Sequence, residues 1–392
     1  MLTTKKARTF SVAGLMFLAV AFSFGQEASS DDIGKPTYAA RPFSASTQPA
    51  AAGEALPPVV TIPHWSGSFV YKSAHGDKQK FSYTMVGTSP WEGSATTAVP
   101  AAIVPISLTF SNGMTLDGGS RVEATIASPI FQPFHSQTGF TQYGDAITRA
   151  SFYRAVRSTS PDWHVVLAQP AVLPVQSLVV PADAGFEFTG SHSGAPIGLV
   201  DIDWFSAQLH KLVTTLDTDP RSLTIFLTYN SFLFLGHPAK CCVAGFHSGL
   251  VVKGPDTTGI NTFVWASFSD PDIFSAPLQD VTALSHEIAE WYADPFLSNV
   301  VPSWAEPGSS VCTSTMLEVA DPVEVFPNLS FRVTLNGVEY HPQDAAFFSW
   351  FARQRPSIGL KGRYSYRGGK FSAPAPACQA SPLAKPGPEK PY

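Results

Sequence analysis

Apolar residues in the first half of the chain follow strand-like patterns. The stretch A-V-P-A-A-I-V-P-I-S-L-T-F-S at 98–111 is rich in β-forming residues, and Asn112-Gly113 directly after it predicts a tight turn. The prolines in this stretch favour an edge strand or a bend over a central strand. Shorter strand-like runs return over 164–180. This half of the chain is therefore predicted to be mainly β-structure.

Helical spacing first occurs over 142–156, where Ile147, Phe152 and Val156 can share one apolar stripe. Further elements follow towards the C-terminus, and Asn336-Gly337 marks the turn of a hairpin. We expect helices over 203–216 and 277–293, buried strands over 223–235 and 261–268, and a hairpin over 331–340.

This order of elements predicts an α+β fold with a β-rich N-terminal part and a mixed C-terminal part. Hydrophobic residues make up 44% of the 392 residues, charged residues only 14%, and there are 34 prolines. Such a composition is typical of a globular, loop-rich protein with few solvated helices. We predict a signal peptide at 1–25, a disordered Ala/Ser/Pro-rich linker at 26–58, a β-rich region at 59–196, an α+β region at 197–371 and a Pro-rich tail at 372–392.

The N-terminus has the pattern of a secretory signal peptide. Lys5, Lys6 and Arg8 precede an apolar run from Val12 to Phe24, which is followed by small residues. A run of about 13 residues is short for a membrane span, although an uncleaved anchor is the alternative. We therefore expect a secreted or periplasmic protein with no stable membrane span after cleavage of the signal.

The chain has four cysteines, and an even number in an exported protein suggests disulfides. A bond between the adjacent Cys241 and Cys242 would be strained, so we expect each to pair with Cys312 or Cys378. A cysteine metal site is the alternative, although the spacing fits no zinc ribbon.

Several functional classes lack support in the sequence. The net charge is −5 without a long basic run, so we expect no nucleic-acid partner. We find no P-loop and no nucleophile elbow of a serine hydrolase. A group of aromatic residues towards the C-terminus could line a pocket for a sugar or a peptide, but such residues usually form the core. These are Trp291, Trp304, Phe347, Phe348, Trp350 and Phe351.

The most informative stretch is S-H-E-I-A-E-W-Y-A-D-P-F at 285–296. It resembles the H-E-x-x-H signature of zinc hydrolases, with Glu290 in place of the second histidine. On a helix, His286 and Glu290 project together and can bind one ion. Glu287 points about 100° away, where a general base beside the metal would lie. The alternative is an acidic helix whose Glu290 pairs with a nearby cation.

A zinc site needs a third protein ligand. Glu318, in M-L-E-V-A-D at 316–321, is the best candidate. Asp321 would then accept a hydrogen bond from a ligand histidine without binding the ion itself. Asp294 competes as the ligand, although Asp294-Pro295 should end the helix and turn the carboxylate away. His247, with His237 behind it, is a further candidate, but a histidine satisfied within a loop is the more frequent case.

One histidine and two glutamates form a harder, more anionic site than the usual zinc-hydrolase set. Zinc is the expected cofactor, and calcium or manganese are the alternatives.

The helix motif, together with L-E-V-A-D-P, resembles a group of exported bacterial proteins that have a zincin-like helix. The segments Q-Y-G-D-A-I-T-R-A and C-C-V-A-G-F-H-S also look like that group. More distantly, the same region is similar to the exordium and phosphate-induced proteins of plant cell walls. The resemblance implies a zincin-like C-terminal part with His286, Glu290 and Glu318 as ligands and Glu287 as base. Glu290 occupies the position that the second histidine has in the standard motif.

Two functions follow as hypotheses. The first is an exported metal-dependent hydrolase of zincin type, acting on a peptide or another extracellular substrate. The second is a non-catalytic extracellular or envelope binding protein with a structural or vestigial metal site.

Overall fold

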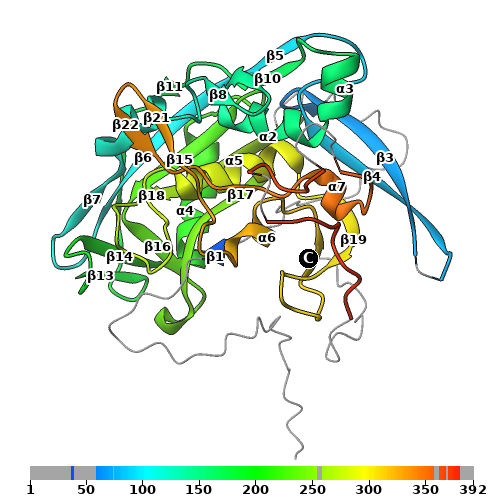
Figure 1. Ribbon diagram of the computed structural model, residues 1–392. Coiled ribbons are helices and arrows are strands. Elements are labelled where there is room, and N and C mark those ends of the chain that lie inside the picture. Colours follow the sequence, from blue (N-terminus) through cyan, green and yellow to red (C-terminus); the bar gives the residue numbers. More distant parts are fainter. Residues whose placement is uncertain are drawn as a thin grey trace, which may run out of the picture.

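The structure is a computed structural model that describes residues 37–38, 59–73, 75–253, 258–356, 362–367 and 370–379. The predicted signal peptide lies outside these residues, as do most of the predicted linker and the tail from 380 onwards. The fold is α+β, as predicted, with a large mixed sheet and a few helices (Figure 1).

The central sheet joins strands from both halves of the chain. Its main path has the order β11-β6-β15-β18-β17-β16-β14-β13. β6, β15 and β18 are parallel to one another, whereas β17 is antiparallel to both of its neighbours. The strands are β6 (Ala101–Thr109), β11 (Ala171–Val172), β13 (Gly185–Thr189), β14 (Pro196–Asp201), β15 (Leu223–Tyr229), β16 (Ser231–Phe234), β17 (Cys241–Lys253) and β18 (Thr258–Phe268).

β6 is not the edge strand that its prolines suggested. It pairs with β15 on one side and with β11 and β12 (Gln176–Val179) on the other. On that second side the pairing skips Val104 and Pro105, so the imide nitrogen of Pro105 lies in the gap between two short partner strands. Pro100 separates β6 from β5 (Thr96–Val99), which is the bend that was expected.

The sheet separates two hydrophobic cores. Successive residues of β18 alternate between them, since Val264 belongs to the larger core while Phe263 and Trp265 belong to the smaller one. α2 (Tyr143–Ser151) and α5 (Thr282–Ala293) pack together over the larger core (Figure 1). α4 (Ile202–Thr215) covers the smaller core through residues such as Phe205 and Leu209.

The predicted helices are confirmed, with two changes at their ends. The helix expected over 142–156 divides at Phe152 into α2 and α3 (Tyr153–Ser158). The helix expected from 277 begins only at Thr282, because Asp280 has a φ of 43° and cannot continue an α-helix. The strand expected over 223–235 is likewise interrupted, at Asn230, where φ is 45°.

Both Asn-Gly turns are confirmed. Asn112-Gly113 connects β6 to β7 (Thr115–Asp117), which pairs antiparallel with it. Asn336-Gly337 connects β21 (Val333–Leu335) to β22 (Val338–Tyr340), and both turn residues have positive φ, 52° and 81°, as a type I′ turn requires.

A long hairpin of β3 (His64–Lys72) and β4 (Lys78–Val86) projects from one side of the molecule (Figure 1). The remaining elements are short. They are β1 (Thr37–Tyr38), β2 (Val59–Val60), η1 (Gly118–Arg121), α1 (Val122–Ile126), β8 (Phe134–Ser136), β9 (Gly139–Thr141), β10 (His164–Leu167), η2 (Pro238–Lys240), β19 (Val300–Trp304), β20 (Ser314–Met316), α6 (Asp321–Glu324) and α7 (Phe348–Phe351).

The predicted disulfide pairing is wrong. Cys241 is bonded to Cys242, and Cys312 is bonded to Cys378. The segments of the second pair lie side by side, since the Cys312 N–H donates to the Gln379 carbonyl at 2.9 Å. Cys378 therefore fixes the start of the predicted Pro-rich tail. No helix in the described part of the chain has the length and apolarity needed to cross a membrane.

The sequence regions on either side of residue 196 are joined in one sheet. β6 comes from the first region and pairs with β15 of the second. Within the predicted linker, β1 pairs with β17.

Candidate metal centre

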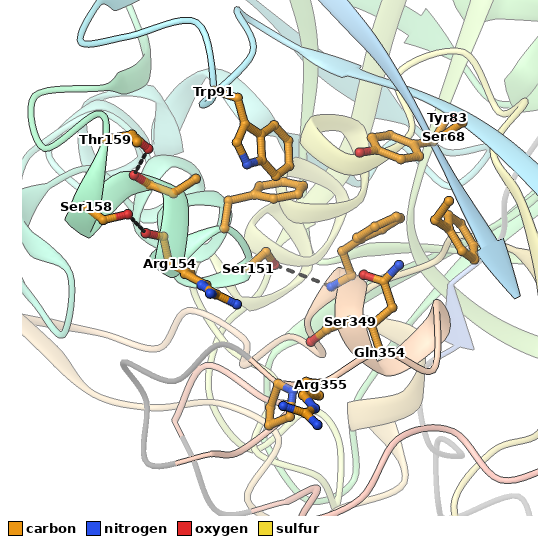
Figure 2. A pocket seen from close by; sticks show the side chains of 15 residues that line it. Ser68, Tyr83, Trp91, Ser151, Arg154, Ser158, Thr159, Ser349, Gln354 and Arg355 are labelled. Carbon is orange, nitrogen blue, oxygen red and sulfur yellow. Dashed lines mark hydrogen bonds between the residues drawn. The ribbon is translucent and has the colours of Figure 1, made fainter.

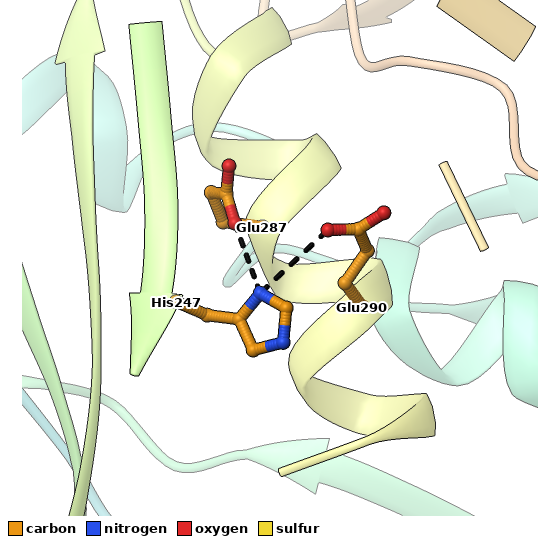
Figure 3. A group of neighbouring side chains, drawn as sticks. All are labelled: His247, Glu287 and Glu290. Atoms are coloured by element: carbon orange, nitrogen blue, oxygen red, sulfur yellow. Dashed lines mark hydrogen bonds and ion pairs between the residues drawn. The ribbon is translucent and has the colours of Figure 1, made fainter. Parts of the chain in front are cut away.

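Three segments converge beside α5 on the larger core. β17 contributes His247, and α5 contributes the motif that begins at His286. The third segment contributes Glu318 from the loop before α6, and Asp321 and Glu324 from α6 itself. α5 packs directly on β17 and β18, which places its acidic face against His247 (Figure 3).

The first group of potential ligands contains His247, Glu287 and Glu290, all buried. The Nδ1 atom of His247 lies 3.2 Å from Oε2 of Glu287 and 3.6 Å from Oε2 of Glu290. Figure 3 shows the imidazole between these two glutamates of α5.

The second group contains His286, Glu290 and Asp321. The Nε2 atom of His286 lies 3.2 Å from Oε2 of Glu290 and 3.4 Å from Oδ1 of Asp321. The expectation that His286 and Glu290 project together from the helix is thus confirmed. The Nδ1 atom of His286 is 3.7 Å from Oε1 of Glu324. Glu290 belongs to both groups, and neither group contains both histidines.

Glu318, the predicted third ligand, lies at the edge of this cluster. Its Oε2 is 4.0 Å from Nε2 of His247, and it belongs to neither of the two groups. The side chain is only 5% exposed, and neither carboxylate oxygen has a hydrogen-bond partner among the described residues.

The competing ligands are used elsewhere. Asp294 ends α5, and its carboxylate accepts hydrogen bonds from the backbone N–H groups of Ser298 and Asn299 at 2.9 and 3.0 Å. His237 accepts a hydrogen bond from the N–H of Ala239 at the start of η2. Asp294 nevertheless lies close enough to the cluster to contribute to the raised pKa values of His247 and Glu318.

The cluster is closed towards the sheet and partly open towards α6. The side chains of His247, His286 and Glu287 are at most 1% exposed. Those of Asp321 and Glu324 are 30% and 17% exposed. The members of the cluster that contact solvent are therefore those of α6.

Burial shifts the pKa of the proposed base upward. Desolvation raises the pKa of Glu287 to about 7, although His247 and His286 act in the opposite direction. Burial alone lowers the pKa of His247, but the facing carboxylates of Glu287 and Glu290 outweigh it and the net shift is upward. The pKa of His286 is raised for the same reason, mainly by Glu290.

The acidic residues are affected differently. Burial and the repulsion of Glu290 raise the pKa of Glu318 well above its usual value, and that of Asp321 to about 6. Glu290 is the exception: burial raises its pKa, but His286 and His247 more than offset this and the net shift is downward. Its Oε1 also accepts a hydrogen bond from the Ala320 N–H at 3.1 Å.

These residues fit a cation. In the described part of the chain, Glu287, Glu290 and Glu318 form ion pairs only with histidines. Four buried atoms that can bind metal have no hydrogen-bond partner there, namely Nε2 of His247, Oε1 of Glu287 and both carboxylate oxygens of Glu318. Buried carboxylates without compensation are costly, and a bound divalent ion removes that cost. Imidazole and carboxylate ligands suit zinc and manganese.

His247 was given too little weight as a ligand from the sequence, and Glu324 was not identified as a candidate. The available signal for His247 was a lone histidine inside the apolar stretch C-C-V-A-G-F-H-S-G, which forms a buried strand. Glu324 follows Asp321 by three residues, so both lie on one face of a short helix. Only the tertiary structure brings α6 to His286.

Comparison with protein-family models, with curated proteins and with solved structures gave no significant match.

Proposed function

We propose that the protein is an exported metal-dependent hydrolase whose centre is built around Glu290. The proposal rests on one observation: two groups of imidazole and carboxylate ligands, one fully buried and one partly exposed at Asp321, share this buried glutamate. The resemblance of S-H-E-I-A-E to the zinc-hydrolase motif supports the same chemistry.

His286, Glu290 and Asp321 are the residues that would hold the ion, with Glu318 nearby as the ligand predicted from the sequence. Their side chains face one another within ion-pair distance, and Asp321 is the partly exposed member. When bound, such an ion polarises a carbonyl group and lowers the pKa of a water molecule. A water molecule or substrate would approach from the side of Asp321 and Glu324, the partly exposed residues of the cluster.

Glu287 is the proposed general base. His247 contacts its Oε2, whereas Oε1 lies close to Gly245 of β17 and has no hydrogen-bond partner among the described residues. A pKa of about 7 is suited to accepting a proton near neutral pH and releasing it later. His247 acts as a positioning residue that fixes the orientation of this carboxylate.

A peptide is the proposed substrate class, by analogy with the zincin motif alone. A second candidate is a binding protein with a structural metal. The near-complete burial of His247 and Glu287 favours it, because structural sites are closed whereas catalytic ones keep an open position.

The test is cleavage of an unfolded protein mixture by the purified mature protein, with new termini identified by mass spectrometry. The same assay is run on metal-depleted protein and on Glu287→Gln, with Glu123→Gln as the matched control because Glu123 is exposed on α1. The hydrolase predicts new termini with wild type and Glu123→Gln only. Cleavage that Glu287→Gln leaves unchanged would exclude the proposed mechanism, and a metal-loaded protein without cleavage would support the binding protein.

A further inference from the structure

A pocket of about 710 Å³ lies between the β3–β4 hairpin, α3 and α7, away from the metal cluster (Figure 2). Its lining is mixed, with aromatic rings and a set of hydroxyl, amide and guanidinium groups. A volume of this size accommodates a small organic molecule.

The apolar part of the lining is made by aromatic side chains from several elements. They are Phe69, Tyr83, Trp91, Phe152 and Phe348. Phe348 is the central ring, since it contacts Phe69, Tyr83 and Phe152 at centroid distances of 5.4, 4.6 and 5.9 Å. Trp91, with 56% of its surface exposed, contacts Phe152 at the pocket's rim.

The charged part of the lining is entirely positive. Arg154 on α3 and Arg355 after α7 both line the pocket, and no acidic residue does. Neither arginine forms an ion pair with a carboxylate in the described part of the chain. Two guanidinium groups at one pocket of a protein with a net charge of −5 form a local site for an anion.

Two hydroxyl groups add hydrogen-bonding capacity. Oγ of Ser349, a residue only 6% exposed, has no hydrogen-bond partner among the described residues, and Ser349 lines the pocket. Burial raises the pKa of Tyr83 to about 12, so its hydroxyl stays protonated and can donate. Figure 2 shows both residues among the lining side chains.

We propose that this pocket binds a small hydrophobic carboxylate. The apolar body, of the size of a phenyl or indole ring, would lie against Phe152 and Phe348, and the carboxylate would pair with Arg154 and Arg355. The two oxygens of a carboxylate match the geometry of a guanidinium group.

A sugar ligand fits the lining less well. Sugar hydroxyls are commonly held by carboxylate acceptors, and this lining has none.

The inference is independent of the proposed hydrolase. A gap of about 20 Å³ shares Ser151, Phe152 and Phe348 with the pocket and reaches Ala289 and Tyr292 of α5. These α5 residues lie on a different face of the helix from Glu287 and Glu290. The pocket and the cluster can therefore be tested separately.

The experiment is titration calorimetry of the full mature chain, at low ionic strength, with 3-phenylpropionate and indole-3-acetate. Each acid is compared with its uncharged amide. The double variant Arg154→Gln with Arg355→Gln is compared with Arg157→Gln, an exposed arginine of α3 that does not line the pocket.

We expect at least one of the acids to bind, with its amide roughly tenfold weaker or worse, because charge-assisted hydrogen bonds are lost. The double variant should bind the acid with an affinity lowered by a similar factor, and Arg157→Gln should bind it with the affinity of wild type. Equal binding of acid and amide, or no binding of either acid at millimolar concentration, would overturn the proposal.

Discussion

The Oε2 atom of Glu287 lies 3.2 Å from Nδ1 of His247, although 40 residues separate them in the sequence. The contact joins the strand that runs antiparallel to its neighbours in the sheet to the helix that carries the H-E-x-x-E motif. It fixes one oxygen of the proposed base and leaves the other free of hydrogen bonds to the described residues. Both β17 and α5 therefore supply residues to the centre.

Gly245 controls how closely α5 approaches β17. A Cβ atom at this position would lie 2.8 Å from both Cγ and Oε1 of Glu287. Gly245→Ala should therefore displace the Glu287 carboxylate, lower any hydrolytic activity by at least about tenfold and destabilise the fold by about 1–3 kcal/mol. Activity and chemical denaturation measure the two effects.

The control is the same substitution in a Glu287→Ala background. Removing the side chain that the new methyl group meets should relieve most of the cost, leaving the 3.1 Å approach to the Trp265 carbonyl. An equal loss of stability in both backgrounds would show that Glu287 is not what Gly245 accommodates.

Glu318 should contribute to metal affinity. Its carboxylate oxygens are buried without hydrogen-bond partners in the described structure. Glu318→Gln is expected to weaken metal binding by at least about tenfold while leaving the metal-free protein about as stable as wild type, because the raised pKa of Glu318 already favours its uncharged form and glutamine has the same shape. Competition with a chromogenic chelator measures the affinity. Unchanged affinity would remove Glu318 from the site.

The metal-free protein should become more stable as the pH falls from about 8 to 5. The folded pKa values of Glu287, Asp294 and Asp321, about 7, 6 and 6, are raised by burial above those of the unfolded chain. The folded state therefore binds more protons, and the stability that this contributes is lost as the pH rises through these values. The raised pKa values of His247 and His286 change the stability with pH in the same direction.

The pKa of Glu290 is lowered, so this residue changes the pH dependence of stability only below its usual pKa of 4.5, outside the range from pH 8 to 5. A bound cation should reverse the trend, because it requires the deprotonated carboxylates. Melting temperatures with and without chelator across the pH range test both statements. A metal-free protein that loses stability on acidification from 8 to 5 would contradict the assignment of the buried acids.

The sequence allowed the elements around the site to be predicted, but not the way they pack. His286 and Glu290 could be predicted to share a helix face because four residues make about one turn. The i, i+4 contact of 3.2 Å follows directly from that spacing.

His247 could not be placed in the same way, because its position depends on β17 lying beneath α5. The order β18-β17-β16 is a property of the sheet, and nothing local in C-C-V-A-G-F-H-S-G encodes it. β6 was misjudged for a related reason: Pro105 is tolerated inside the sheet because two separate short strands pair on either side of it.

The disulfide between Cys312 and Cys378 should be the stabilising one. It closes a segment with a sequence separation of 66, and removing such a crosslink frees the unfolded chain. Replacing both residues with alanine is expected to lower the free energy of unfolding by about 2–4 kcal/mol.

The matched comparison is Cys241→Ala with Cys242→Ala. That bond joins neighbouring residues and constrains almost no chain entropy, so its loss should cost less. Denaturant titration of both double variants shows which disulfide contributes more to the free energy of unfolding. A larger loss of stability for the adjacent pair would show that local packing outweighs the chain-entropy effect.

Elemental analysis of the purified mature protein tests the central claim most directly. Wild type, His286→Ala, Glu290→Gln and the control Glu123→Gln are loaded with zinc or manganese, freed of excess ion and measured for metal per chain. The account predicts bound metal in wild type and Glu123→Gln, and its loss in His286→Ala and Glu290→Gln. A wild-type protein that retains no metal after loading, or one whose metal content both variants leave unchanged, would contradict it.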